Sequence, residues 1–318
     1  MLAFLPLFVF SLSLSPSLRA CPIALFQEQA PGKERLAAEP SYERFKLPAD
    51  TKSEGSGADL LYALRTPDLE PNAEQPPVPR RVVLALPPGA QTAPMADWIA
   101  SDMASSAFGD SIVVSPIAPN GQSFYADASP LLPPFLDEIE RRFGVPRGEI
   151  HLAGVSNGGR SALHLALNHP ERFASLSVLP GVLPHDDDAK RIARLRVLPV
   201  ALWVGEDDAP GWHEGAKRIQ KGLTEAGGDV TLRVVSGVGH VLPPVHWTEV
   251  RMHMDRATIA SLLDDFHDAA ARADLERYFG HFAPNGVFIG TDATERWPVE
   301  EFRAFCEPYF KDSESAWV

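Results

Sequence analysis

Apolar residues follow two alternating patterns between residues 81 and 235. Short, continuous apolar runs are typical of strands buried on both faces, and they are separated by segments whose apolar residues recur every three or four positions, as in a helix that covers a sheet. The strand-like runs occupy residues 81–86, 111–117, 149–153, 173–179, 199–204 and 229–235, and the helical patterns occupy residues 93–105, 135–143 and 158–168. The alternation predicts an α/β fold with a doubly wound, mostly parallel sheet.

Two features refine this prediction. Strand-like stretches at residues 42–47 and 60–65 precede the alternating region and are separated by the glycine- and serine-rich residues 53–57. Between the strands that end at 179 and begin at 199, there is room for only a short helix. We therefore expect no large lid over the sheet and an open cleft.

The pattern changes after residue 254. Apolar residues from Ile259 to Ala270 form a helical stripe, and the residues that follow predict a helix, a strand and a helix. These elements are expected at residues 275–279, 287–290 and 299–310. We therefore place one domain at residues 42–254 and a second segment at 255–318.

The N-terminus is typical of an export signal. Residues 2–18 are apolar but too short and too broken by proline to cross a bilayer, so residues 1–20 are interpreted as a signal peptide, although no Lys or Arg precedes Arg19. Residues 21–41 lack periodicity and are interpreted as a tether. The sequence Leu18-Arg19-Ala20-Cys21 resembles a bacterial lipoprotein processing site. Three alternatives remain open for the N-terminus. The protein is a periplasmic lipoprotein anchored through lipidated Cys21, a secreted protein with an ordinary cleaved signal, or a protein with an apolar N-terminal helix.

Composition excludes some partners. The net charge of -13 and the lack of a Lys/Arg cluster argue against binding of a nucleic-acid backbone. Only two cysteines occur, so at most one disulfide is possible, and none if Cys21 carries lipid. Cys306 lies in an apolar helical pattern and is expected to be a small core residue rather than a nucleophile.

The most informative motif is a G-x-S-x-G formed by Gly154, Ser156 and Gly158. It follows the strand-like run at 149–153 and opens a helical pattern, which is the context of a nucleophile elbow. A strained turn of this kind exposes the serine hydroxyl and brings its neighbours so close to other backbone that only glycine fits. Ser156 is therefore the candidate nucleophile.

A serine nucleophile needs a histidine to take its proton and a carboxylate to orient that histidine. The run at 199–204 ends at Gly205-Glu206-Asp207-Asp208, which delivers carboxylates to the carboxyl edge of a strand. Asp208 is the first candidate acid and Asp207 the second. The last strand-like run leads through Ser236-Gly237-Val238-Gly239 to His240, the candidate base.

The chain order Ser, Asp, His and these three motifs resemble the α/β-hydrolase superfamily from about residue 80 to 244, and within it the carboxylesterase, dienelactone-hydrolase and polyhydroxybutyrate-depolymerase-like esterases. Those esterases carry a His-Gly-Cys-Thr-Gln-Thr type of loop after an early strand, whereas residues 86–92 here read Leu-Pro-Pro-Gly-Ala-Gln-Thr. Proline has no N–H to donate. The resemblance therefore implies an oxyanion hole formed by the backbone N–H groups of Asn157 and Gly89, with Ala90 as the alternative to Gly89.

The segment from about residue 257 to 310 resembles the start of a SnoaL-like domain, the cone-shaped fold of the nuclear-transport-factor superfamily. Its most specific part is the sequence at 288–297. The long antiparallel strands that complete such a cone are not found before residue 318, so the resemblance is partial. We expect the exposed apolar face of a partial cone either to self-associate or to pack on another surface.

No metal or cofactor is expected from the sequence. The ten histidines form no H-E-x-x-H motif, and no C-x-x-C pair accompanies them. The run His185-Asp186-Asp187-Asp188 lacks regular ligand spacing and is interpreted as a solvated turn, and His164 as a satisfied histidine on a helix.

Together these features predict an exported serine esterase that cleaves a small-molecule carboxylic ester through an acyl-enzyme intermediate. In this hypothesis Ser156 attacks, His240 transfers the proton and Asp208 orients His240. The alternative is a noncatalytic binding or scaffolding protein with a degenerate hydrolase core, which the two prolines at 87 and 88 favour.

Overall fold

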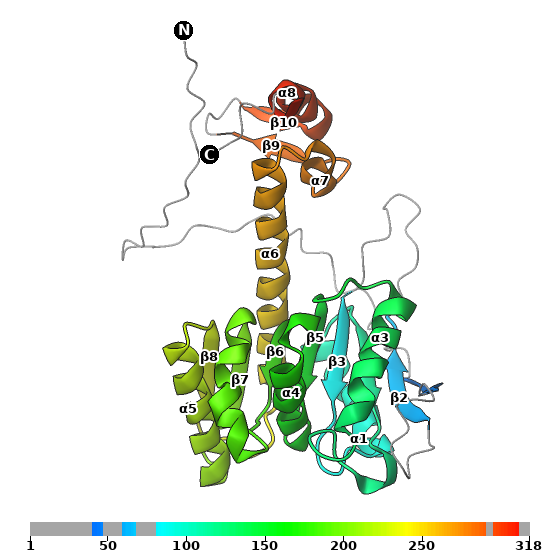
Figure 1. Cartoon of the computed structure of the whole chain (residues 1–318), viewed down its shortest axis with the longest axis vertical. Coiled ribbons are helices and arrows are strands. Elements are labelled where there is room, and N and C mark those ends of the chain that lie inside the picture. The colour runs from blue at the N-terminus through cyan, green and yellow to red at the C-terminus, as the bar shows by residue number, and fades with distance from the viewer. Residues whose placement is uncertain (1–39, 47–58, 68–80, 291–294, 312–318) are drawn as a thin grey trace. The chain divides into compact units, whose positions relative to one another are not determined.

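The computed structural model of the chain describes residues 40–46, 59–67, 81–290 and 295–311 (Figure 1). The predicted signal peptide, residues 21–39 of the predicted tether with Cys21, and residues 291–294 of the SnoaL-like motif lie outside these ranges. The last residue assigned to the tether, Ser41, begins the first strand. Within them, no helix is both long enough and apolar enough to cross a membrane.

An eight-stranded sheet has the order β1-β2-β4-β3-β5-β6-β7-β8. Its strands are β1 (Ser41–Phe45), β2 (Leu60–Arg65), β3 (Val82–Leu86), β4 (Ile112–Pro116), β5 (Ile150–Gly154), β6 (Phe173–Val178), β7 (Val200–Gly205) and β8 (Val230–Val235). The six strands from β3 to β8 pair in parallel, and β2 pairs antiparallel with both β1 and β4. The predicted doubly wound, mostly parallel sheet is confirmed.

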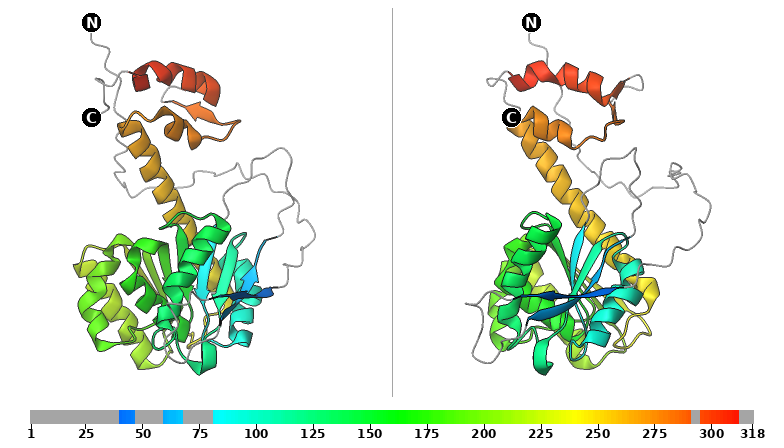
Figure 2. Two further views of the ribbon diagram at one scale, coloured as in Figure 1. Left: turned by 45° about the vertical axis from the view of Figure 1, so that its right-hand side comes forward. Right: turned by 90° about the vertical axis from the view of Figure 1, so that its right-hand side faces the viewer.

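The sheet is covered on both faces, as its continuous apolar strands require. In β3, Val82, Leu84 and Leu86 enter one hydrophobic cluster, whereas Val83 and Ala85 enter another on the opposite face. The first cluster includes apolar residues of helices α3 (Leu132–Phe143), α4 (Asn157–Asn168) and α5 (Pro210–Glu225). The second includes residues of the π-helix η2 (Ile99–Met103) and of helices α2 (Ala104–Ala107) and α6 (Trp247–Ala271). Both layers can be followed in Figure 2.

Two details of the helices were not anticipated. The helix expected at 93–105 is divided into α1 (Ala93–Trp98), η2 and α2. Helix α5 follows the acidic turn, where no helix was predicted. The short helix expected between the sixth and seventh strands is the 3-10 helix η6 (Asp186–Val197). Four shorter 3-10 turns occupy Pro119–Gly121, Ser129–Leu131, Pro170–Arg172 and Pro244–His246.

Helix α6 runs across the predicted domain boundary at residue 254. Trp247, Val250 and Met254 are buried against the sheet, and Thr258 Oγ1 lies 3.2 Å from Nε2 of the buried His151 on β5. Farther along the helix, the apolar side chains are exposed, as at Ile259. The part of α6 that serves the sheet therefore extends at least one turn beyond residue 254.

The C-terminal segment, defined here as residues 275–311, contains the expected helix, strand and helix. Its elements are α7 (Leu275–Gly280), β9 (Val287–Ile289), β10 (Arg296–Pro298) and α8 (Val299–Lys311), and β9 pairs antiparallel with β10. Its own apolar cluster is centred on the buried residues Phe279, Phe302, Cys306 and Phe310. The buried position of Cys306 agrees with the expectation that it is a core residue.

Candidate active site

Ser156 lies on a sharp turn between β5 and α4, with φ 56° and ψ -116°. This left-handed conformation is strained for a residue with a side chain. A Cβ atom at Gly158 would lie 1.9 Å from the carbonyl oxygen of Leu86, and one at Gly154 would lie 2.2 Å from the carbonyl oxygen of Gly158. Both glycines are therefore required by the close approach of backbone around Ser156, as the motif predicts.

His240 and Asp208 lie next to this turn. His240 Nε2 is 2.8 Å from Ser156 Oγ, and His240 Nδ1 is 3.0 Å from each carboxylate oxygen of Asp208. The three residues follow the carboxyl ends of β5, β7 and β8, the edge at which open α/β sheets place their sites. Because the carboxylate can only accept, we assign the proton to Nδ1, which leaves the Nε2 lone pair facing the serine hydroxyl.

Of the two candidate carboxylates, that of Asp208 faces His240. Asp208 is 8% exposed, and its Oδ1 also accepts a hydrogen bond from the backbone N–H of Ala209 at 2.7 Å. Asp207 is exposed, and its backbone N–H donates to the carbonyl of Val238. A Cβ at Gly205 would lie 2.1 Å from the carbonyl oxygens of Val238 and Gly239, so this glycine lets the His240 loop approach the acidic turn.

The loop after β3 lies against the start of α4. The Asn157 side chain donates a hydrogen bond from Nδ2 to the carbonyl oxygen of Gly89 at 2.9 Å, and Gly89 has φ +59°. The structure thus brings together the two residues proposed for the oxyanion hole. Pro87 and Pro88 precede Gly89 and donate nothing.

Gln91 holds this loop in place through two side-chain hydrogen bonds. It was not identified from the sequence. It is fully buried, it donates from Nε2 to Ser161 Oγ at 3.0 Å, and its Oε1 accepts from the backbone N–H of Phe124 at 2.9 Å. Its φ of 56° is positive. The available signal was the Gln-Thr pair, which matches the esterase loop. We interpret Gln91 as a positioning residue for the Gly89 turn.

Trp212 is a second residue that the sequence did not reveal. Its ring lies against His240, with 4.8 Å between the ring centroids. Trp212 belongs to the first turn of α5, the helix that had no sequence prediction. The next residue, His213, is half-buried, and its Nε2 has no hydrogen-bond partner among the described residues.

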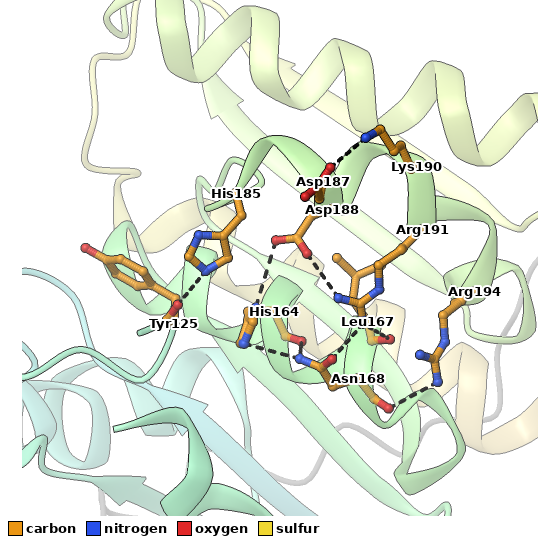
Figure 3. A network of polar contacts seen from close by, with 10 residues as sticks. All are labelled: Tyr125, His164, Leu167, Asn168, His185, Asp187, Asp188, Lys190, Arg191 and Arg194. Atoms are coloured by element: carbon orange, nitrogen blue, oxygen red, sulfur yellow. Dashed lines mark hydrogen bonds and ion pairs between the residues drawn. The ribbon is translucent and has the colours of Figure 1, made fainter. Parts of the chain in front are cut away.

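A second polar cluster joins α4 to η6 (Figure 3). One ligand-type atom each of His164, His185 and Asp188 lie within 4.8 Å of one another, so these are the described residues best placed to hold a metal ion. The contacts that these residues already make oppose the binding of a metal ion. His185 Nε2 lies 2.8 Å from the Tyr125 carbonyl oxygen, and Asp188 Oδ1 is 3.4 Å from an Arg191 nitrogen.

The hydrogen bonds of His164 also oppose metal binding. Arg191 donates to Asn168 Oδ1, which directs the Asn168 amide nitrogen toward His164 Nε2 at 3.2 Å. Nε2 must then accept, and the proton of the neutral ring is on Nδ1, which faces Asp188. Burial lowers the pKa of His164, which favours the neutral ring. We therefore interpret the cluster as a brace between two elements. The interpretation of residues 185–188 as a solvated turn is incomplete, because Asp188 is buried.

Comparison with solved structures identifies the fold of the sheet region. A thermostable esterase superposes with a TM-score of 0.52 at 18% identity, over 72% of this chain and 64% of the esterase, so the chain spans somewhat less than two thirds of that protein's length. A ferulic acid esterase gives 0.53 at 19% identity, over 69% and 97% of the two chains. An S-formylglutathione hydrolase from Agrobacterium tumefaciens gives 0.50 at 17% identity, over 69% and 95%. The sheet region has the α/β-hydrolase fold.

The C-terminal resemblance is also confirmed. Residues 259–318 match the SnoaL-like domain family. The match begins within α6, beyond the residues that pack on the sheet. A search of curated proteins gives no match.

Proposed function

We propose that this chain, whose sheet region has the α/β-hydrolase fold, is a serine esterase that hydrolyses a small carboxylic ester through an acyl-enzyme intermediate. The observation that carries the proposal is the continuous line of contacts from Ser156 Oγ to His240 at 2.8 Å and from His240 to the buried Asp208 at 3.0 Å. The esterases and hydrolases among the similar structures support a hydrolase at the level of the fold.

In the first half of the reaction, His240 Nε2 takes the hydroxyl proton of Ser156 as Oγ bonds to the ester carbonyl carbon. Asp208 holds the ring in the required tautomer and stabilises the imidazolium that forms. The carbonyl oxygen becomes an oxyanion. When the carbon–oxygen bond to the alcohol breaks, His240 gives its proton to the departing alkoxide, and the acyl group remains on Ser156.

In the second half, water replaces the alcohol. His240 takes a proton from the water as its oxygen attacks the acyl carbon, and the bond to Ser156 Oγ then breaks. The proton returns to Oγ, and the acid product leaves. Throughout, we assign the oxyanion to the backbone N–H groups of Asn157 and Gly89, with Ala90 as the alternative to Gly89.

Hydrolysis of p-nitrophenyl acetate tests this function. Ser156→Ala removes the nucleophile and should lower kcat by several powers of ten, to the level that the remaining site supports. Ser101→Ala is the matched control, because the Ser101 hydroxyl donates to the carbonyl of Asp97, one helical turn earlier, and has no other recorded bond in the described part of the chain. Equal rates for wild type and Ser156→Ala would reject the proposal.

We further propose that the protein is exported by its first 20 residues. Expressed in a bacterium with its native N-terminus, it should leave the cytoplasm. If Cys21 is lipidated, Cys21→Ser should release it from the membrane fraction, and membrane association that survives this substitution would reject lipidation.

A further inference from the structure

Arg160 is a cation on the same helix as the nucleophile. It lies four residues after Ser156, and its backbone N–H donates to the Ser156 carbonyl at 3.1 Å. Four residues correspond to about 6 Å along a helix, and helical side chains lean toward the N-terminus. The Arg160 side chain therefore leaves α4 on the side of Ser156 and leans toward it.

The Arg160 guanidinium is positioned by Tyr125. Its central carbon lies 4.2 Å from the centre of the Tyr125 ring, and one nitrogen lies 3.4 Å from the Tyr125 hydroxyl. The backbone oxygen of Tyr125 is in turn bonded by His185, as Figure 3 shows. Because an aromatic face attracts a cation without neutralising it, this arrangement fixes the guanidinium and leaves its charge available.

The loop that carries Tyr125 is joined to the proposed oxyanion loop. The backbone N–H of Phe124, the residue before Tyr125, donates to Gln91, which in turn bonds Ser161 on α4. Gly89, two residues before Gln91, is bonded by Asn157, four residues before Ser161. The loop of Tyr125 is thus linked by hydrogen bonds to the loop of Gly89 and to α4, the helix that begins after Ser156 and carries Arg160.

The charge of Arg160 has no carboxylate partner in the described part of the chain. Its Nε is buried and has no hydrogen-bond partner there, and the recorded contacts of the guanidinium are those with Tyr125. The buried Arg172, in contrast, is paired with Asp137 and Glu140. A planar cation with free donors is suited to a planar anion such as a carboxylate.

We propose that Arg160, held by Tyr125, binds a carboxylate group carried by the ester substrate, so that the enzyme prefers monoesters of dicarboxylic acids or similar anionic esters. This inference rests on the proposed esterase function and names its substrate class. The interaction is a charge-assisted hydrogen bond to a half-buried cation. Such a bond contributes about 10- to 100-fold in kcat/KM.

The test compares two substrates of similar size, p-nitrophenyl hemisuccinate and p-nitrophenyl valerate, with wild type and three variants. Wild type should have the higher kcat/KM on the hemisuccinate. Arg160→Gln should lower the ratio of the two kcat/KM values by about 10- to 100-fold, and Arg160→Lys should retain part of it. Arg147→Gln removes an exposed arginine paired with Glu171 and should leave the ratio unchanged.

The outcomes separate this inference from the function on which it rests. Hydrolysis of neither ester by wild type would reject the esterase itself. If wild type hydrolyses both esters and Arg160→Gln does not change the ratio of the two kcat/KM values, only the role of Arg160 is rejected. A ratio that falls equally in Arg147→Gln would reject it too, because the effect would then be one of overall charge. Unfolding temperatures of all variants establish that each is folded.

Discussion

The sheet region and the C-terminal segment are stabilised in different ways. Every residue of β3, β5 and β7 is buried, and the strands exchange parallel backbone hydrogen bonds on both sides. In the C-terminal segment, β9 and β10 have three residues each, and Val287 and Ile289 remain 46% and 64% exposed. Rings supply much of its packing, such as those of Phe288 and Phe302, whose centroids lie 3.9 Å apart.

This difference determines how precisely each region can hold side chains in place. The proposed triad would have to be held to within a fraction of an ångström, which requires supports that are buried and hydrogen-bonded over their length. Ser156, Asp208 and His240 all follow strands of the large sheet. A segment with short strands and a small apolar cluster opens locally at a lower free energy. We therefore expect hydrolysis to depend on the sheet region and to be insensitive to local opening of the C-terminal segment.

The largest expected effect is a loss of kcat, and it tests how precisely the sheet region positions its side chains. Asp208→Asn replaces a carboxylate by an amide that cannot fix the required tautomer of His240, and should lower kcat by about 10⁴. The neighbouring Asp207→Asn alters an exposed side chain and should have a much smaller effect. Kinetics on p-nitrophenyl acetate measure both. A larger loss in Asp207→Asn would mean that the acid is Asp207.

An intermediate effect tests the independence of the C-terminal segment. Phe302 is 7% exposed and contacts the rings of Phe279 and Phe288. Phe302→Ala should cost about 3 to 5 kcal/mol. That loss should speed hydrogen exchange throughout residues 275–311 and leave exchange in β3 and β5 unchanged.

Phe305→Ala is the matched control, because Phe305 lies on the same helix but is 41% exposed. Its effect on exchange should be small. If Phe302→Ala destabilised β3 and β5 as much as α8, the two regions would form one cooperative unit, and the contrast between them would be wrong.

The smallest expected effect concerns His151, where the sheet meets α6. Burial, with smaller contributions from Arg81 and His253, lowers the pKa of His151 to about 3. Because the unfolded chain keeps a value near 6.5, it binds a proton that the folded chain does not. The contribution of neutral His151 to stability is thus complete above pH 6.5 and is lost as the pH falls toward 3.

Between pH 8 and pH 5 this loss amounts to about 2 kcal/mol. Denaturant unfolding at the two pH values should give a smaller difference for His151→Asn than for wild type, whereas the exposed His267→Asn should keep the full difference. An unaltered pH dependence in His151→Asn would contradict the assignment. Burial also lowers the pKa of His253, so part of the dependence should remain.

Much of this architecture could be predicted because local patterns determine it. Strands buried on both faces leave continuous apolar runs, and the elbow leaves glycines where backbone approaches closely. The sequence favoured Asp208 over Asp207 but did not show which carboxylate faces His240, because this depends on where the turn after Gly205 directs each side chain.

Contacts between distant segments account for the rest. Trp212 reaches His240 from a helix whose own pattern gave no prediction. His164 and Asp188 meet only because α4 and η6 pack together, and Arg160 meets Tyr125 across 35 residues of sequence. The sequence did not show that α6 continues through the predicted boundary at residue 254, because the first part of this helix packs on the sheet and its later apolar residues are exposed.

The most direct test of the central claim is covalent labelling by a fluorophosphonate, read as a mass increase of the intact protein and assigned to a residue by peptide mapping. Wild type should gain one adduct on Ser156, Ser156→Ala should gain none, and His240→Ala should react far more slowly because nothing takes the hydroxyl proton. Labelling of Ser156→Ala at the wild-type rate, or an adduct on another residue of the wild type, would contradict the account.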